Sequence, residues 1–419
     1  MATLLSAVEK KMPIFTAATP GAFRIFVIIF SSLFVASGDT AIFSTEYTLV
    51  AFFVMISGIG FSTILVKSMA INSNINAFFC YSLSSAVIGG GVIFLISFLA
   101  AYLVPLPDFY SVLLLVIATS LYQVFRSYLI FNKKFWLLLL NDVLVGFFYV
   151  CLLVSYFLLF DELKVHQVFV FLSISYFLSL LVVLLLEVRE SRAEASFFKN
   201  IRLVSSGNTI SSLVVGVSNA ASGGVSFLLP SFFIALGGEE IAIVASLAVL
   251  VFSSIAAIPR GIINNGSASL SRMVLNVKFD DVLVSGLKNK IKRVIALLFP
   301  LLSFFILVYF YFFTSVNNFS SVFIFVMAIG FYVATAQLGV VESVLINLCG
   351  YESMALIFNT AMFLMVLIIF MLASFTPYLV GGELAVYLVP FILGLSNIFR
   401  LYWYRRLVKQ FFAKTYSSN

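Results

Sequence analysis

Charged residues are scarce in this chain, because Asp, Glu, Lys and Arg together make up only 10% of its 419 residues. A typical soluble domain carries about 25% charged and about 45 to 50% apolar residues. Here the apolar share reaches 63%, and the mean hydropathy is +1.16. The chain lacks the polar residues needed to cover a water-soluble particle, so we expect it to lie in a lipid bilayer.

The residue types that carry most enzyme chemistry are also rare. His166 is the only histidine, and the cysteines Cys80, Cys151 and Cys349 form neither a disulfide framework nor a CxxC metal site. The sequence has no HExxH motif, no P-loop and no credible catalytic triad. We therefore expect no metal site and no cofactor, and the chain is not predicted to be an enzyme.

Long apolar runs, in contrast, are abundant. Each is long enough for a membrane-spanning helix, which needs about 20 apolar residues, and none alternates strictly as a barrel strand does. The sequence predicts an all-α polytopic membrane protein with twelve transmembrane helices. The predicted spans are residues 21–38, 46–67, 77–104, 109–131, 135–160, 165–187, 207–236, 240–260, 291–314, 319–348, 354–376 and 384–404.

The basic residues fall on one side of this predicted membrane. With the N-terminus inside, every Lys and Arg except Lys164 lies toward the inner end of a span or in an inner loop. Positively charged loops stay on the cytoplasmic side during insertion. Both termini are therefore expected in the cytoplasm, and the net charge of +7 reflects topology and not nucleic-acid binding.

Weak internal repeats divide the chain into two halves. Arg126-Ser127-Tyr128-Leu129-Ile130 resembles Glu342-Ser343-Val344-Leu345-Ile346, and Asn141-Asp142 resembles Asn359-Thr360. Repeats of six spans start on the same side, so a pseudo-two-fold axis along the membrane normal relates them and a substrate path between them is expected. The predicted parts are a cytoplasmic N-terminal lead (1–20), a six-helix bundle (21–187), a cytoplasmic linker (188–206), a second six-helix bundle (207–404) and a basic cytoplasmic tail (405–419).

Few charged residues lie within the spans, and a charge at the bilayer centre costs about 2.5 to 3.5 kcal/mol, so each needs a partner, a wet cavity or a function. Arg24, Arg126, Asp142 and Glu342 all fall in the cytoplasmic half. Lys67 and Arg260 lie at span ends. The cations are either ligands for an anion or anchors that reach the headgroups, and Asp142 either binds an ion or pairs with Arg126.

Polar residues also follow single helix faces at seven-residue spacing, which drifts by only about 20° per repeat. Such a face either lines a wet cleft or allows close helix packing. The first span carries Arg24, Ser31 and Gly38, the eighth carries Ser246, Ser253 and Arg260, and the seventh carries Asn208, Ser211, Ser212, Asn219, Ser222 and Ser226. Gly89-Gly90-Gly91, Gly223-Gly224, Pro259 and Pro300 are candidate bending points.

The arrangement resembles the polysaccharide transporter family, the O-antigen flippases of the Wzx type in the multidrug/oligosaccharidyl-lipid/polysaccharide (MOP) superfamily. The resemblance covers nearly the whole chain. It lies in the twelve spans in two halves, the Lys10-Lys11 lead before Arg24, and Ile258-Pro259-Arg260 followed by Ser269-Leu270-Ser271-Arg272. It implies a MATE-like fold with a V-shaped central cleft.

The same resemblance implies a function. A member carries an undecaprenyl-pyrophosphate-linked oligosaccharide from the cytoplasmic to the periplasmic leaflet of a bacterial inner membrane by alternating access. The resemblance implies that Arg24 and Arg260 hold the pyrophosphate. Arg126 and Lys67 are further candidates for binding it. Asp142 and Glu342 are candidates for binding a coupling ion, either H⁺ or Na⁺. The expected partners are this lipid-linked oligosaccharide, membrane lipids, and the polymerase and chain-length proteins of the same pathway.

Two other readings stay open at this point. A cation-coupled multidrug exporter of the same fold is expected to use an acidic, aromatic cleft, which the excess of arginine disfavours. A membrane-embedded oligosaccharide polymerase or glycosyltransferase generally needs a large outer loop. The predicted outer connections at 105–108, 161–164 and 237–239 are only a few residues long.

Overall fold

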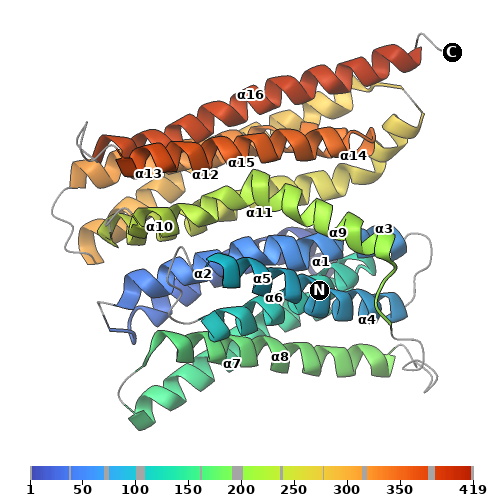
Figure 1. Ribbon diagram of the computed structural model, residues 1–419. Helices are drawn as coiled ribbons and strands as arrows, with labels where there is room; N and C mark the ends of the chain where they lie inside the picture. The colour runs from blue at the N-terminus through green and yellow to red at the C-terminus, as the bar shows by residue number, and fades with distance from the viewer. Residues whose placement is uncertain are drawn as a thin grey trace. The chain divides into compact units, whose positions relative to one another are not determined.

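The computed structural model describes residues 2–36, 39–69, 75–100, 109–160, 163–190, 202–235, 239–276, 278–313, 319–375 and 383–416. This part of the chain is almost entirely helical, and its one strand-like contact is an isolated bridge between Val35 and Leu163 (Figure 1). Helices dominate because hydrocarbon offers the backbone no water to bond with, and a helix satisfies its own N–H and C=O groups. The predicted all-α membrane fold is confirmed.

A helical segment occupies the position of each predicted span. Predicted spans four and five coincide with α6 and α7, and three other spans are interrupted by a π-helical turn. The elements are α1 (Ala2–Ser31), α2 (Thr40–Val54), η2 (Met55–Ile59), α3 (Gly60–Met69), α4 (Ile75–Ser84), η3 (Ser85–Gly89), α5 (Gly90–Ala100), α6 (Phe109–Phe131), α7 (Phe135–Phe160), α8 (Val165–Glu190), α9 (Ser206–Asn219), η5 (Ala220–Gly224), α10 (Val225–Ala235), α11 (Glu239–Leu275), α12 (Asp281–Phe313), α13 (Phe319–Leu338), α14 (Val340–Leu348), α15 (Glu352–Phe375) and α16 (Glu383–Tyr416).

Eight of the described helical segments are long enough and apolar enough to cross a bilayer. A ninth is obtained if α13 and α14, which meet at an angle of 43°, count as one span. The other three of the twelve predicted spans correspond to α1, α11 and α16. In α1 and α11 the apolar stretches are shorter, at Thr19–Ser31 and Ala242–Ser253.

The helices on either side of the predicted inner connection at 261–290 are longer than expected, which corrects that boundary. α11 continues to Leu275 and α12 already begins at Asp281, so both helices extend into this connection. Bilayer thickness limits how long the apolar stretch of a helix is, but its polar ends can continue into water. The basic tail after residue 404 is likewise helical, because α16 ends only at Tyr416.

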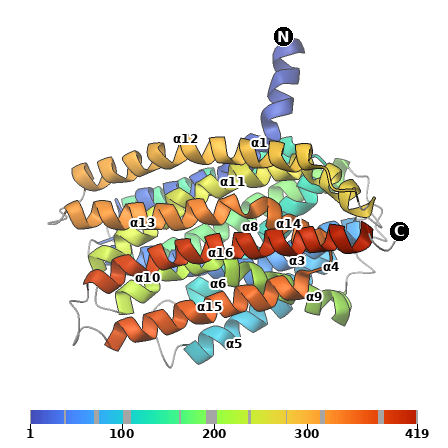
Figure 2. The same ribbon diagram turned by 90° about the horizontal axis from the view of Figure 1, so that it is seen from above.

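The contacts group the chain into two compact units. The first contains residues 1–12 and 26–231, and the second contains residues 13–25 and 232–419. In the second unit α16 packs along α13, and α11 contacts both α12 and α13 (Figures 1 and 2). The grouping places α9 and η5 in the first unit, which differs from the predicted boundary at 188–206.

Close packing of glycine explains why α9 belongs to the first unit. A Cβ atom added to Gly60 would lie 2.1 Å from the Ser212 carbonyl oxygen, and one added to Gly216 would lie 2.4 Å from the Ile56 oxygen. Only residues without a side chain allow the two backbones to approach so closely. The polar face of α9 is therefore used, at least at Gly216, for helix packing.

The first unit has an aromatic core near the predicted cytoplasmic ends of its helices. It is built from α3, α4, α6, α7 and α8, and its fully buried side chains include Phe61, Leu65, Phe125, Leu129 and Leu138. This core surrounds the ends of the helices that carry the charged residues described below. It excludes water from them, which strengthens any interaction between opposite charges there.

Candidate functional site

The first charged cluster joins α6 to α7. Arg126 and Asp142 form an ion pair with an Nη1 to Oδ2 distance of 2.9 Å, and their side chains are only 5% and 6% exposed. Tyr122, one helical turn before Arg126, donates its hydroxyl to Asp142 and accepts a bond of 3.1 Å from Arg126 Nη1. Because both charges are buried, each is neutralised mainly by the other.

This geometry matches the expectation that Asp142 pairs with Arg126, and not the alternative that Asp142 binds an ion. Arg126 was predicted as a ligand for pyrophosphate and Asp142 as an ion-coupling residue. In the structure the guanidinium and the carboxylate bind each other. An incoming anion or cation would therefore have to displace one member of the pair, and neither residue is available to a ligand in this arrangement.

A second cluster ties α6 and the start of α7 to the end of α8. Lys134 Nζ lies 2.8 and 2.7 Å from the two carboxylate oxygens of Glu187, and Tyr128 Oη donates to the same carboxylate at 2.9 Å. The Glu187 side chain is 2% exposed, whereas that of Lys134 is 30% exposed. This network was not predicted from the sequence, because Glu187 lies more than fifty residues from both partners.

The third cluster lies in the second unit, around the buried carboxylate of Glu342 on α14. Lys288 Nζ from α12 and Arg405 Nε from α16 both bind Glu342 Oε1, at 2.8 and 2.7 Å. Two cations on one carboxylate leave this cluster with a net positive charge. Glu342 was predicted to bind a coupling ion, and that role remains a prediction.

The remaining predicted cations differ in their surroundings. Arg24 is half-buried on α1, which places a guanidinium within the predicted first span. Lys67 is exposed in the last turn of α3. The side chain of Arg260 lies outside the described residues, although its backbone is part of α11, and Gly38 lies outside them entirely. Their assignment to pyrophosphate binding remains a prediction.

The predicted polar stripes are satisfied largely within their own helices. Ser246 donates to the carbonyl of Ala242 at 2.9 Å, Ser253 to that of Leu250 at 2.7 Å, and Ser222 to that of Asn219 at 3.3 Å. A serine hydroxyl that bonds the preceding turn needs no water, so this pattern is typical of close helix packing.

The other stripe residues are placed more variously. Ser31 is buried on α1, where it donates to Val27 and bonds with the hydroxyl of Tyr149. Asn208 is exposed, Asn219 is half-buried, and the Ser212 hydroxyl is buried without a hydrogen-bond partner. Asn208 and Ser211, which are both exposed, thus offer their side chains most openly to a ligand.

Two buried polar residues add to the set found from the sequence. Asn141, next to Asp142, has both amide atoms buried without a hydrogen-bond partner. Glu46 on α2 is only 3% exposed. The signal for both was present, because each is a polar residue in or at the edge of an apolar run. Among the described residues no group of three His, Cys, Asp or Glu side chains is placed to hold a metal ion.

Comparison with known proteins identifies solved structures that share this fold. No protein-family model matches the sequence, and no curated protein matches it significantly. Solved structures do match. An inward-facing multidrug resistance MATE family transporter of the MOP superfamily superposes with a TM-score of 0.64 at 13% identity, covering 97% of this chain and 98% of that one.

This chain has the MATE fold. A MOP superfamily transporter from Pyrococcus furiosus, described as having a binding pocket of reverse polarity that suggests a different function, gives a TM-score of 0.60 at 13% identity, with 96% and 95% coverage. A variant of a Vibrio cholerae MATE transporter gives 0.59 at 12% identity, with 99% and 98% coverage. At these identities the likeness concerns the MATE fold alone, and cargo must be argued from this chain's own residues.

Proposed function

We propose that this MATE-fold protein is a flippase that moves an undecaprenyl-pyrophosphate-linked oligosaccharide from the cytoplasmic to the periplasmic leaflet of a bacterial inner membrane. The supporting observation is the state of three of the buried acids. Asp142, Glu187 and Glu342 are each held by a cation, and Glu342 is held by two. A cationic drug would have to compete with these cations for the three carboxylates, whereas an anionic cargo can use a cation outside these pairs, such as the exposed Lys67.

The cargo poses a specific physical problem, which the polar residues of the spans address. A sugar chain and a charged pyrophosphate must cross about 30 Å of hydrocarbon, while the lipid tail stays in lipid. Arg24 presents a planar guanidinium that can bind a phosphate through two parallel hydrogen bonds. Lys67 adds a point charge at the inner end of α3, where the cargo loads. Asn208 and the tyrosines supply hydrogen bonds and stacking surfaces for sugars.

Binding and release of a coupling ion would act through the buried pairs. A proton or Na⁺ that reaches Asp142 takes the place of Arg126, which then carries an uncompensated charge until it finds another anion. The pyrophosphate is such an anion. Ion binding and cargo binding would thus be linked through one guanidinium, and the same reasoning applies to Arg405 beside Glu342. The coupling ion is identified by measuring whether an imposed H⁺ gradient or an imposed Na⁺ gradient drives export.

The test is genetic and chemical together. In a deletion strain, lipid-linked oligosaccharide should accumulate on the cytoplasmic leaflet, measured by whether a membrane-impermeant reagent can reach its sugars. Arg24→Ala should lower export by about 10- to 100-fold, because one hydrogen bond to a charged group contributes about 1.5 to 3 kcal/mol. Arg24→Lys should retain part of the activity. Arg202→Ala, at an exposed residue before α9, is the matched control.

A multidrug exporter is the second candidate, and one finding favours it. The matching solved structures include multidrug resistance MATE transporters over almost the whole chain. In that case the deletion strain should become sensitive to cationic drugs while the distribution of lipid-linked oligosaccharide stays normal. That result, together with full export in Arg24→Ala cells, would reject the flippase proposal.

A further inference from the structure

The last helix is too long to lie within the bilayer. α16 has 34 residues, which at 1.5 Å per residue gives about 51 Å, against a hydrocarbon thickness of about 30 Å. Tyr402 and Trp403 are 66% and 38% exposed, at the end of the predicted span. Exposed Tyr and Trp typically mark the level of the lipid headgroups. The following turns of α16 therefore lie at or just beyond that level.

These turns are held against the rest of the second unit. Phe412 packs edge-on against Phe279, between α11 and α12, at 5.1 Å between ring centroids, and Phe411 contacts Tyr351. Leu407 and Val408 are buried on the same side of the helix. The opposite side of α16 consequently has a fixed orientation, which a free basic tail would lack.

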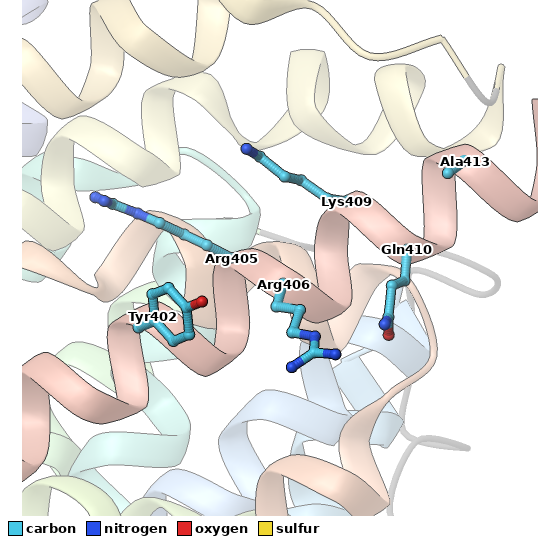
Figure 3. Close-up of a pocket in the computed structure, with 6 residues that line it drawn as sticks. All are labelled: Tyr402, Arg405, Arg406, Lys409, Gln410 and Ala413. Atoms are coloured by element: carbon cyan, nitrogen blue, oxygen red, sulfur yellow. The ribbon is translucent and has the colours of Figure 1, made fainter.

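The fixed, exposed side of α16 forms a basic hollow of about 600 Å³ lined by Tyr402, Arg405, Arg406, Lys409, Gln410 and Ala413 (Figure 3). Arg405 and Lys409, one turn apart, extend to one side, and Arg406 and Gln410 extend to the other (Figure 3). No carboxylate in the described part of the chain forms an ion pair with Arg406 or Lys409. Three cations thus share the hollow with one polar amide and one phenol.

We propose that this hollow binds the phosphate headgroup of an anionic phospholipid of the inner leaflet. The proposal uses the predicted cytoplasmic orientation of α16. Arginine and lysine at this depth meet the anionic phosphates of the cytoplasmic leaflet, and basic pockets beside membrane helices are typical headgroup sites. The volume suits a whole headgroup, and Tyr402 lies on the membrane side, where it contacts the glycerol region. A nucleic acid or an acidic protein is disfavoured because the hollow begins at the membrane interface.

The site is connected to the interior through Arg405. Its Nε binds buried Glu342 while its side chain remains 45% exposed at the hollow. A phosphate in the hollow would therefore compete with Glu342 for this guanidinium. Headgroup binding and the protonation or ion-binding state of Glu342 should then influence each other.

Native mass spectrometry of the purified full chain tests the site. The protein is titrated with dioleoylphosphatidylglycerol and, separately, with dioleoylphosphatidylcholine. We expect one phosphatidylglycerol to bind at least about tenfold more tightly than phosphatidylcholine, because its binding includes charge-assisted bonds without a competing cation. Arg406→Gln with Lys409→Gln should remove this preference. Arg293→Gln removes another exposed arginine, which lies on α12 outside the hollow, and should preserve the preference.

Three outcomes would overturn the proposal. One is equal binding of the two lipids by the wild type, and another is an equal loss in the Arg293→Gln control, which would mean that the interaction depends only on total charge. The third comes from a competition assay in which inorganic pyrophosphate and farnesyl pyrophosphate each displace bound phosphatidylglycerol. If farnesyl pyrophosphate does so at a much lower concentration than inorganic pyrophosphate, the hollow is a loading site for an isoprenyl pyrophosphate and not a phospholipid site.

Discussion

At the scale of single residues, Arg126 and Asp142 are the pair whose separation should cost most. Removing one member leaves the other charge buried without its partner, which typically costs about 3 to 5 kcal/mol. We therefore expect Asp142→Asn to lower the thermal unfolding temperature of the purified protein strongly. The free energy of unfolding of each variant can be measured by denaturant titration in detergent.

The double variant separates the ion pair from simple packing. Arg126→Met together with Asp142→Leu removes both charges, and apolar replacement of a buried pair is often neutral or stabilising. Its stability should therefore lie close to that of the wild type and well above that of Asp142→Asn. Losses that simply add from the two single substitutions would contradict this account.

The sequence predicted where these charges lie along the helices but not what they touch. Arg126 and Asp142 lie on consecutive helices joined by a short turn, so their pairing was foreseeable as one of two alternatives. The cations that bind Glu342 lie on α12 and α16, and the cation that binds Glu187 lies just before α7. The rotation of each helix about its axis decides such contacts, and apolar runs that face lipid and protein alike carry little information on it.

At the scale of helices, the contact between α3 and α9 gives a sharp prediction for Gly60. A methyl group there would lie 2.1 Å from a backbone oxygen of α9 and 3.0 Å from Gly216 Cα, so the helices must move apart. Overpacking of this kind costs about 1 to 3 kcal/mol. Gly60→Ala should therefore destabilise the protein, as measured by its midpoint of thermal unfolding.

Gly91 is the matched control within the same unit. A Cβ atom added to Gly91, in α5, would meet nothing within 4 Å, and alanine favours the helix by about 1 kcal/mol over glycine. Gly91→Ala should leave the midpoint unchanged or raise it. If both variants lost the same stability, glycine flexibility and not the close approach of α3 and α9 would be the cause.

The same scale shows what apolar patterning predicts well. Spans bounded by turn-forming residues, such as 109–131 and 135–160, match α6 and α7 at both ends. The π-helical turns Ser85–Gly89 and Ala220–Gly224 fall at two glycine-rich segments predicted as bending points. The turn at Met55–Ile59 was missed, since one glycine within an apolar run gives no distinct signal. Helix extensions beyond the bilayer were missed because a span is defined by hydropathy alone.

At the scale of the whole molecule, two charged positions of the first unit recur in the second with the opposite sign. Glu187 and Arg405 are 218 residues apart (405 − 187), the same offset that separates Asn141 from Asn359 (359 − 141). The first unit has Arg126 on α6 and Glu187 on α8, whereas the second has Glu342 on α14 and Arg405 on α16. The sequence repeat thus extends to a further position, with acid and base exchanged.

The sign of the transported charge gives a test of cargo class that involves the complete protein. Outward movement of an anion is favoured by an interior-negative potential, by about 2.3 kcal/mol per elementary charge per 100 mV. In reconstituted vesicles, a valinomycin-induced potassium potential of that sign should accelerate outward movement of a fluorescent isoprenyl-pyrophosphate sugar. Vesicles with valinomycin and equal potassium on both sides are the control, and strong buffering of lumen and bath at one pH prevents a pH difference. A carrier of cationic drugs gains nothing from this potential in the outward direction, so transport that is slowed or unchanged would argue against an anionic cargo.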